Sequence, residues 1–588
     1  MIQGIGAATG VAIGKAFVLP HWELDLPDSE MDAVDLAKEF ERLYEGIRTS
    51  KNEIEYIKNE FKEMVGPEES QIFDAHLAIL EDPVFMNEIQ GIIERQYKAA
   101  EVAVKEAIDH FVSMFDLLDD EYMKERALDI KDVGNRLLKH LLGAPEVKLP
   151  ADTQPYILVA KELSPSQLVH LNPSHVLGIV TMTGGITSHS AIMARALGIP
   201  LVSGIENKLE EPIQTGEYLV VDGDTGLLYV EPDAIILEQY EEIRDQQRKK
   251  KEQLQLLAMV DPVTKDGVSF NLAANMSSVK ELDIALKHGA FGVGLFRTEF
   301  LYMDRHSFPT EDEQFEVYKL VAENVGQGSA VIRTLDIGGD KPLDYLPLAE
   351  EENPFLGYRA IRICLDNAEL FQTQLSAILR ASVYGNVKIM YPMISSVEEL
   401  KQANAILRQA MEDLDQRGLA YNPDIKVGIM IEVPAAVTIA DLLAEEADFF
   451  SIGTNDLVQY VLAVDRMNEQ IAHMYRPFHP AILRMLRMTV DAAHKAGIPV
   501  SVCGELAGDE RAIPIWLELG IRSLSMSPQS LLRVKHRILN TNAADAKAEA
   551  AACFKLSTVS AIEERLSAFS ERDSSSAKEA KGTDSTAS

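Results

Sequence analysis

Apolar residues recur at helical spacing through the first quarter of the chain. The clearest stripe falls at i, i+4, i+7 and i+11 and consists of Leu36, Phe40, Leu43 and Ile47. Similar patterns return over 54–64, 99–115 and 122–142. Residues that share one helix face in this way bury that face against other helices. The pattern therefore predicts a bundle of four or more helices within residues 23–145.

The texture changes to short apolar strands on either side of this bundle. Residues 1–22 are Gly-rich and β-like, and turns separate the later strands expected at 156–160, 176–181 and 218–222. One helix, at about 188–197, interrupts these strands. We expect residues 1–22 and 146–231 to form one small α/β domain into which the bundle is inserted. A charged helical linker over 232–260 follows.

A longer rhythm occupies residues 261–570. Eight apolar, β-branched segments alternate with helical ones and lack polar alternation, which is typical of strands covered on both faces. They read VSFNLAAN, FGVGLFR, AVIRTLD, VKIMYPM, KVGIMIEV, FFSIGT, PVSVCGE and SLSMS. Eight such units predict a (β/α)₈ barrel of the TIM type. The Ser-rich, charged segment 571–588 predicts a disordered tail. The fold class is therefore a multidomain α/β protein.

Composition narrows the function. The 588 residues include 56 Lys and Arg against 92 Asp and Glu, a net charge of −36. Such a charge argues against nucleic-acid binding, which needs a basic surface. The sequence has no apolar run long enough to cross a membrane and no secretory signal. Three cysteines in a chain of this length make no disulfide framework, so we expect a reducing, cytoplasmic setting.

Polar residues gather where the predicted barrel strands end, which is where barrel enzymes place their chemistry. They are Arg297, Arg333, Glu432, Asn455, Asp456 and Cys503, with Arg466 ten residues beyond Asp456. Arginines bind phosphate and carboxylate groups in forked geometry. Two carboxylates with a substrate are a usual environment for Mg²⁺. The set predicts a Mg²⁺-dependent site for a small phosphorylated carboxylic acid.

Each of these residues has an ordinary structural explanation when taken alone. An arginine at a strand end can form a salt bridge, and an acidic residue can cap the next helix. A single cysteine such as Cys503 can be a small buried hydrophobic residue. Seven residues of these types at one barrel mouth favour the functional interpretation.

A second constellation surrounds His189, in the run Gly184-Gly185-Ile186-Thr187-Ser188-His189. Two glycines let the backbone approach a ligand closely, and Thr187 or Ser188 can cap the following helix. His189 then stands in the first turn, where free N–H groups favour an anion. The alternative is a capping or core histidine. The sequence around it favours a neutral imidazole nucleophile that carries a phosphoryl group.

At these residues the sequence resembles a known family. GGITSHSAIMARALGIPLVSG is similar to the phosphohistidine signature of phosphoenolpyruvate-utilising enzymes, and IGTNDLVQYVLAVDR is similar to their barrel signature. The insert, with SQIFDAHLAILEDP, resembles the carrier-binding subdomain of the Enzyme I group of the bacterial sugar phosphotransferase system. The resemblance runs from the Gly-rich start to about residue 570.

The resemblance implies a role for each residue. His189 matches the histidine that accepts the phosphoryl group, and Cys503 matches the residue that protonates the enolpyruvate. Glu432 and Asp456 match the Mg²⁺ ligands. The residues that match the phosphoenolpyruvate-binding positions are Arg297, Arg333, Asn455 and Arg466.

The resemblance also implies a reaction and its partners. The phosphoryl group would pass from phosphoenolpyruvate to His189, on a swivelling domain, and then to a histidine of the carrier protein HPr, in support of sugar uptake. Pyruvate would be released. The helical bundle would bind HPr, and the barrel would form a homodimer.

Four other readings of the sequence remain for comparison. A Mg²⁺-enolate lyase barrel acting alone would leave the phosphohistidine domain without a purpose. A dikinase or phosphoenolpyruvate synthase needs a large ATP-binding domain before the histidine domain, whereas the residues here read as helices without a phosphate loop. A non-catalytic sensor would lack His189, the Mg²⁺ ligands or Cys503. A nitrogen-related paralogue usually has an extra N-terminal sensory domain. The sequence here starts with the Gly-rich segment, so we expect the sugar-transport version.

Overall fold

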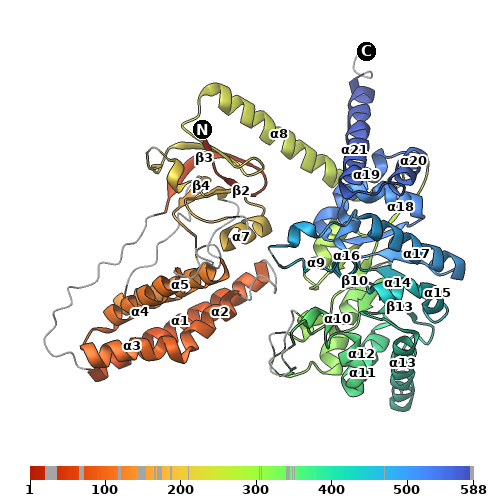
Figure 1. The fold of residues 1–588 in the computed structure, drawn as a ribbon, viewed down its shortest axis with the longest axis horizontal. Coiled ribbons are helices and arrows are strands. Elements are labelled where there is room, and N and C mark those ends of the chain that lie inside the picture. The colour runs from red at the N-terminus through yellow and green to blue at the C-terminus, as the bar shows by residue number, and fades with distance from the viewer. Residues whose placement is uncertain are drawn as a thin grey trace. The chain divides into compact units, whose positions relative to one another are not determined.

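The computed structural model consists of two compact units, Met1–Lys250 and Lys251–Ser588 (Figure 1). The described residues are 1–19, 36–64, 72–116, 121–143, 154–163, 167, 175–185, 188–209, 211–303, 305, 307–326, 328–339, 343, 345–346, 348–349, 351–468 and 470–582.

The first unit contains an eight-stranded mixed sheet in the order β1-β8-β7-β3-β4-β5-β6-β2. Its strands are β1 (Ile2–Gln3), β2 (Ile5–Ala8), β3 (Val11–Val18), β4 (Tyr156–Ala160), β5 (Val176–Thr181), β6 (Leu201–Ser203), β7 (Tyr218–Asp222) and β8 (Leu227–Val230). Strand β3 pairs parallel to β4 and antiparallel to β7. The Gly-rich start of the chain therefore shares one sheet with strands that follow more than 130 residues later.

Five helices lie between β3 and β4 in the described part of the sequence. They are α1 (Leu36–Met64), α2 (Ile72–Glu81), α3 (Pro83–Gln96), α4 (Ala100–Asp116) and α5 (Glu121–Leu142). The stripe predicted on α1 is buried at Leu43 and Ile47, and it continues through Ile54 and Ile57. Apolar residues one turn apart thus hold this helix against its neighbours. The α/β fold with an inserted helical bundle, which the sequence predicted, is confirmed.

The second unit is built on a closed barrel of eight parallel strands, in which β16 pairs with β9. The strands are β9 (Asn271–Met276), β10 (Val293–Phe296), β11 (Ala330–Arg333), β12 (Val387–Tyr391), β13 (Lys426–Ile431), β14 (Phe449–Ile452), β15 (Val500–Val502) and β16 (Ser523–Met526). Seven of them lie within the apolar segments of the sequence and β9 extends one residue beyond its segment, to Met276, so the predicted barrel is confirmed. Because all strands run the same way, their carboxyl ends meet at one mouth.

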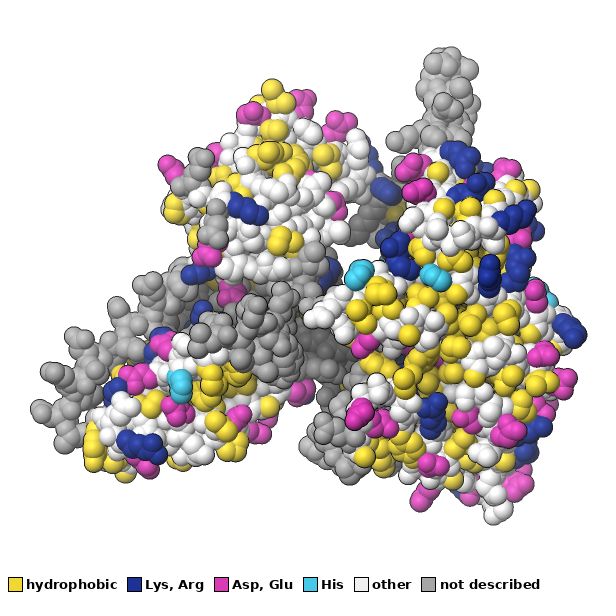
Figure 2. Space-filling view, viewed as in Figure 1, with side chains coloured by type: hydrophobic (Ala, Val, Ile, Leu, Met, Phe, Trp, Pro, Cys, Tyr) yellow, Lys and Arg dark blue, Asp and Glu magenta, His cyan; other side chains and the backbone are white. Residues whose placement is uncertain are grey.

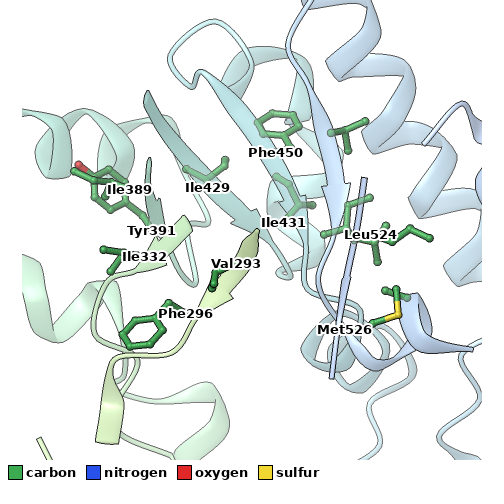
Figure 3. Close-up of a cluster of buried hydrophobic side chains, with 14 of the residues drawn as sticks. Val293, Phe296, Ile332, Ile389, Tyr391, Ile429, Ile431, Phe450, Leu524 and Met526 are labelled. Carbon is green, nitrogen blue, oxygen red and sulfur yellow. The ribbon is translucent and has the colours of Figure 1, made fainter. Parts of the chain in front are cut away.

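Helices surround this barrel. They are α9 (Glu281–Lys287), α10 (Glu311–Asn324), α11 (Ile361–Asp366), α12 (Ala368–Ala381), α13 (Val397–Arg417), α14 (Pro434–Thr438), α15 (Ala440–Leu443), α16 (Thr454–Leu462), α17 (Pro480–Ala496), α18 (Ile513–Leu519), α19 (Pro528–Asn540) and α20 (Ala543–Cys553). Strand side chains such as Ile332, Ile429 and Phe450 belong to the large apolar cluster that these helices complete (Figure 3). Each is fully buried, so burial of apolar area fixes the barrel within its helices.

Two further helices lie in the segments that the sequence assigns to a linker and to a disordered tail. Helix α8 (Ala234–Leu256) occupies most of the segment 232–260 that the sequence assigns to a linker, and it crosses the boundary between the units. Helix α21 (Val559–Gly582) includes residues 571–582, where composition predicts a disordered tail. The helical tendency of Ala, Glu and Lys explains this difference, since these residues lie among the serines. Residues 583–588 lie outside the described part.

The surface carries the negative charge in a dispersed form. On the face drawn in Figure 2, acidic side chains lie among basic ones on both units. Among the described residues, no helix is long and apolar enough to cross a membrane.

Asp266 supplies a pH-dependent contribution to the stability of the second unit. Its carboxylate accepts hydrogen bonds from the backbone N–H groups of Ala543 and Ala544 and from the Thr264 hydroxyl. The bond from Ala543 is the largest of the causes that lower the pKa of Asp266 to about 2. Because the folded pKa lies below the unfolded value of about 4, this contribution is present above pH 4 and lost as the pH falls towards 2.

We therefore expect Asp266→Asn to lower the melting temperature at pH 6 and to have a smaller effect at pH 3. Melting followed by circular dichroism at both pH values checks this expectation. An equal loss at the two pH values would show that the ionised carboxylate is not the stabilising group.

Candidate active site

The carboxyl end of the barrel gathers the predicted side chains of the second unit. Arg297 directly follows β10, Arg333 ends β11, Glu432 directly follows β13 and Cys503 directly follows β15. Asn455 and Asp456 lie in the first turn of α16, immediately after β14. The parallel strands thus bring together residues that lie up to about 200 positions apart in the sequence.

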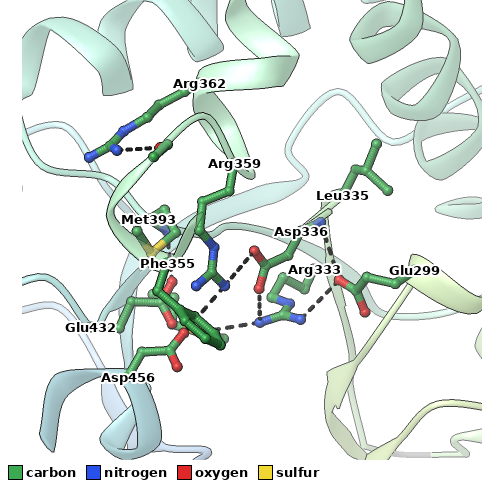
Figure 4. Close-up of polar contacts among 12 residues, drawn as sticks. Glu299, Arg333, Leu335, Asp336, Phe355, Arg359, Arg362, Met393, Glu432 and Asp456 are labelled. Atoms are coloured by element: carbon green, nitrogen blue, oxygen red, sulfur yellow. Dashed lines mark hydrogen bonds and ion pairs between the residues drawn. The ribbon is translucent and has the colours of Figure 1, made fainter. Parts of the chain in front are cut away.

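Arg333 is buried between two carboxylates (Figure 4). Its Nη2 atom lies 2.9 Å from Glu299 Oε1, and its Nη1 atom lies 2.8 Å from Asp336 Oδ2. Burial alone lowers the pKa of this guanidinium, but the surrounding carboxylates, Glu299 first, outweigh burial and raise it. Arg333 is therefore a fixed positive charge whose direction is set by two ion pairs.

Arg359, which the sequence analysis did not select, continues this ion-pair chain. Its Nη2 atom lies 2.9 Å from Asp336 Oδ1 and 3.5 Å from Asp456 Oδ2. Its Nη1 atom donates a hydrogen bond of 3.2 Å to the Tyr460 hydroxyl. Arg359 is 4% exposed. Burial lowers the pKa of this guanidinium, and Asp336 and Asp456 more than offset that effect, so the group stays charged.

Arg466 reaches the same carboxylate from the far end of α16. Its Nη2 atom lies 3.9 Å from Asp456 Oδ1, at the outer limit of an ion pair. Its backbone N–H donates to Gln459 Oε1 at 3.2 Å, which fixes the turn after the helix. The Arg466 side chain is about one-third exposed, so it can turn towards an anionic ligand at the mouth.

Glu432 is the most completely buried carboxylate of the site, at 1% exposed. Its Oε1 atom accepts a hydrogen bond of 2.7 Å from the Met393 backbone N–H. A Cβ atom on Gly453 would lie 2.9 Å from Glu432 Oε2, so a residue with a side chain would press on this oxygen. Burial, followed by the charges of Asp456 and Asp336, raises the pKa of Glu432 above its usual range.

This carboxylate pair fits a divalent cation. Glu432 and Asp456 repel one another strongly enough to affect the pKa of Glu432, and a cation between them would relieve that repulsion. Among the described residues, no group of three or more His, Cys, Asp or Glu side chains is arranged to hold a metal by itself. Two carboxylates whose remaining positions go to substrate and water suit Mg²⁺, which usually keeps several non-protein ligands.

Asn455 is held at the edge of the mouth by Glu505. The Asn455 Oδ1 atom accepts a hydrogen bond of 2.8 Å from the Glu505 backbone N–H, and Asn455 Nδ2 donates to Glu505 Oε1 at 3.3 Å. The Tyr475 hydroxyl donates to the Asn455 carbonyl oxygen at 3.3 Å. These bonds orient the amide at the start of α16.

Cys503 is a buried thiol, 3% exposed. Its Sγ atom lies 3.6 Å from the Ile452 carbonyl oxygen. Burial raises the pKa of the thiol to about 11, while the nearby Arg333 and Arg297 charges act in the opposite direction. The thiol therefore holds its proton at neutral pH and can act as an acid rather than as a thiolate nucleophile.

Arg297 lies in a cavity of about 840 Å³ beside this cluster. Asn275, Glu505, Arg511 and Arg533 also line the cavity, which lies next to the carboxyl ends of β9, β10, β15 and β16. The cavity is large enough to admit a small phosphorylated acid to the mouth.

His189 belongs to the other unit, where it begins helix α7 (His189–Leu197). Ser188 is the N-cap, and its Oγ atom accepts a hydrogen bond of 3.3 Å from the Ala191 N–H. Gly184 has a φ of +106°, which disfavours residues with a side chain. The predicted turn and cap are thus present. The His189 imidazole and residues Ile186 and Thr187 lie outside the described part.

Sequence reasoning missed three charged residues of the mouth: Glu299, Asp336 and Arg359. The first two could have been found, since they lie two and three residues beyond Arg297 and Arg333 near the strand ends. Arg359 gives no such signal, because it lies after an irregular segment and just before α11.

Asp336 compensates two buried guanidinium groups, so its removal tests the ion-pair chain. We expect Asp336→Asn to lower the free energy of unfolding by about 2–4 kcal/mol, because Arg333 and Arg359 stay buried without their shared partner. Urea denaturation measures this loss. The matched control is Asp312→Asn, at the solvent-exposed ion pair with Arg380, with an expected loss of about 0–1 kcal/mol. Equal losses would contradict the central role of Asp336.

Three family profiles match the chain. They describe the N-terminal domain of PEP-utilising enzymes over residues 3–126, the mobile domain over 152–226 and the PEP-binding domain over 235–543. The chain also matches a solution structure of Enzyme I at 34% identity, with a TM-score of 0.36. The match covers 42% of this chain and all of the chain in that structure.

Curated relatives match almost the whole length. The phosphoenolpyruvate-protein phosphotransferase of Bacillus subtilis strain 168 is 46% identical over 561 residues, which cover 95% of this chain and 98% of the relative. That of Geobacillus stearothermophilus is 47% identical over 537 residues, which cover 91% and 92%. That of Priestia megaterium is 46% identical over 544 residues, which cover 92% and 94%. The chain therefore belongs to the PEP-utilising enzymes, within the group of the phosphoenolpyruvate-protein phosphotransferases.

Proposed function

We propose that the chain transfers the phosphoryl group of phosphoenolpyruvate to His189 and then to a histidine of the carrier HPr, with release of pyruvate. The observation that carries this proposal is the barrel mouth itself. It combines fixed guanidinium charges, two adjacent buried carboxylates and a thiol that keeps its proton. The overall length and the family of the chain agree with this reaction.

Phosphoenolpyruvate carries a phosphate and a carboxylate, and both need positive partners. Arg333 is held in place by its ion pairs, whereas Arg297 and Arg466 are only partly buried and can adjust to the ligand. Asn455 adds a hydrogen-bonding amide. Because the whole chain is negatively charged, such a local positive site is needed to hold an anionic substrate.

Glu432 and Asp456 would hold Mg²⁺ together with substrate oxygens. When bound, the ion neutralises charge on the phosphoryl group, which would otherwise repel an attacking nucleophile. Arg359 remains in reach of Asp456 and orients this carboxylate.

The reaction consists of phosphoryl transfer to His189 and protonation of the enolpyruvate that is left. An imidazole nitrogen of His189 forms a bond to phosphorus in line with the breaking bond to the enol oxygen. The enolpyruvate left behind takes a proton at its methylene carbon from the Cys503 thiol. Formation of the more stable ketone draws the reaction forward. His189 begins a helix, where N–H groups and the helix dipole favour the anionic phosphoryl group.

The partners follow from the family and from charge. Helices α1 to α5 would provide the docking surface for HPr, and an acidic chain suits a carrier that is basic around its histidine. A homodimer through the barrel and a cytoplasmic location remain predictions. The three cysteines are free and buried, which agrees with a reducing compartment.

His189 should be the residue that phosphoenolpyruvate phosphorylates. Incubation with phosphoenolpyruvate and Mg²⁺ at neutral to alkaline pH should add one phosphoryl group to the intact protein, and ATP should add none. Intact-mass spectrometry reads this adduct, and added HPr should remove it. His189→Ala should abolish the adduct, whereas the control His110→Ala, at an exposed histidine of α4, should retain it. An unmodified wild-type protein, shown to be folded, would overturn the proposal.

Glu432 should contribute to the affinity for Mg²⁺. Glu432→Gln keeps the size of the side chain but removes its charge, so the Mg²⁺ concentration for half-maximal phosphorylation should rise about 10-fold or more. A Mg²⁺ titration of the initial rate measures this shift. Glu446→Gln, at the surface ion pair with Lys401, is the control and should leave the titration unchanged. A normal titration for Glu432→Gln would remove this residue from the metal site.

A further inference from the structure

The interior of the barrel has an apolar arc and a polar arc. The apolar arc consists of Leu295, Val331, Met390, Met430 and Phe449, which form one buried cluster with Cys503. The polar arc lies on β14, β15 and β16 and contains Ser451, Ser501 and Ser525. Hydroxyl groups inside a barrel need partners, so their bonds show what this arc connects.

A continuous line of hydrogen bonds runs along this arc to the candidate proton donor. Ser451 and Ser501 are register partners on neighbouring strands, and the Ser501 hydroxyl donates to Ser451 Oγ at 3.1 Å. The Ser451 side chain in turn hydrogen-bonds the Cys503 thiol and thereby favours its thiolate form. The Ser501 hydroxyl also lies 3.3 Å from the Phe450 carbonyl oxygen, so rotation of the hydroxyl groups sets the direction in which this series can pass a proton.

The other end of this line opens into a second cavity. It has a volume of about 220 Å³ and lies at the amino ends of the strands, opposite the catalytic mouth. Ser501 lines the cavity together with Asn271, Lys388 and Ser523. The cavity has a mixed lining of apolar and polar side chains, and its volume gives room for several water molecules beside the polar ones.

Lys388 gives this cavity its character. It is the only charged side chain among the described residues that line the cavity, and no described residue forms an ion pair with it. Its ammonium group lies 5.7 Å from the centre of the Phe449 ring, and burial lowers its pKa. A partly desolvated ammonium group stabilises negative charge on a neighbouring water molecule and gives up a proton more readily than an exposed lysine.

Cys503 needs a source of protons after each turnover. A thiol that gives its proton to enolpyruvate is left as a buried thiolate, and it must be protonated again before the next reaction. Water that entered through the catalytic mouth could also attack the phosphoryl group, so a separate path has a chemical advantage.

We propose that Cys503 regains its proton from the opposite end of the barrel, through the Ser451 and Ser501 hydroxyls and water in the cavity beside Lys388. This inference rests on the proposed function, in which Cys503 protonates the enolpyruvate. Ser451 and Ser501 act through Cys503 and do not touch the substrate, so they are positioning residues for the proton.

The proton balance of this path is closed. The Ser451 hydroxyl gives its proton to the Cys503 thiolate, and the Ser501 hydroxyl gives its proton to the Ser451 oxygen. A cavity water protonates Ser501, and the hydroxide that remains takes a proton from the Lys388 ammonium group or from bulk water. No bond to carbon or phosphorus changes, and no electrons are transferred.

Isotope exchange at the thiol tests the path directly. The protein in H₂O is diluted into D₂O for a variable delay, and phosphoenolpyruvate with Mg²⁺ is then added for a single turnover. The methyl group of the released pyruvate is analysed by mass spectrometry, because its new hydrogen reports the isotope on Cys503. Loss of protium with increasing delay gives the exchange rate of the thiol.

We expect Ser501→Ala to slow this exchange about 10-fold or more, because the path then lacks one of its two hydroxyl groups. Ser501→Thr, which keeps the hydroxyl and has space for its methyl group in the cavity, should restore the rate. Ser523→Ala is the matched control, because Ser523 is the register partner of Ser501 on β16 and lines the same cavity but takes no part in the Ser501–Ser451 hydrogen bond. It should exchange like the wild type.

Each outcome decides the matter. Equal exchange rates for the wild type, Ser501→Ala and Ser523→Ala would overturn the path. Absence of a phosphoryl adduct in the wild type would instead overturn the proposed function, and the path with it. If Cys503→Ala still showed the delay-dependent protium signal, another group would be the proton donor. The yield of adduct in each variant, measured in the same samples, confirms that the variants are folded.

Discussion

The ion-pair chain from Glu299 through Arg333, Asp336 and Arg359 to Asp456 is the constraint on which the site depends. A guanidinium group removed from water is costly unless carboxylates compensate it, and here each buried guanidinium has two carboxylate neighbours. The chain therefore keeps two guanidinium groups charged at the barrel mouth and fixes the direction in which each points. An anionic substrate meets charges that are already in place, so little reorganisation is needed on binding.

The barrel supports this arrangement by dividing its two faces. The outward strand side chains are almost wholly apolar and pack beneath the helices, which supplies the stability of the unit. The inward side chains do not pack beneath the helices and can therefore include the polar groups of the site. Charged groups occupy the carboxyl end, an apolar cluster fills one arc, and hydroxyl groups occupy the other. Chemistry on the phosphoryl group and supply of the proton can thus take place at opposite ends of one barrel.

The proposed reaction also assigns its two chemical partners to different units of the chain. The proposed phosphoryl acceptor, His189, begins a short helix in the first unit, and the proposed substrate-binding residues all belong to the second. A histidine that must serve first a small acid and then a protein gains from being on a separate unit. The cap by Ser188 and the backbone at Gly184 fix the start of its helix independently of the barrel.

The sequence by itself determined the architecture and most of the side chains that meet at the barrel mouth. The eight apolar segments predicted the barrel because strands covered on both faces need continuous apolar runs, and residues at strand ends must share one mouth in a parallel barrel. Arg333, Glu432 and Cys503 were found by this rule. Arg359, the partners of Arg333 and the Ser501–Ser451 line were decided only by the tertiary structure. The reason is physical: periodicity records which side of an element is buried, whereas an ion pair or a hydrogen bond depends on which distant side chain arrives opposite.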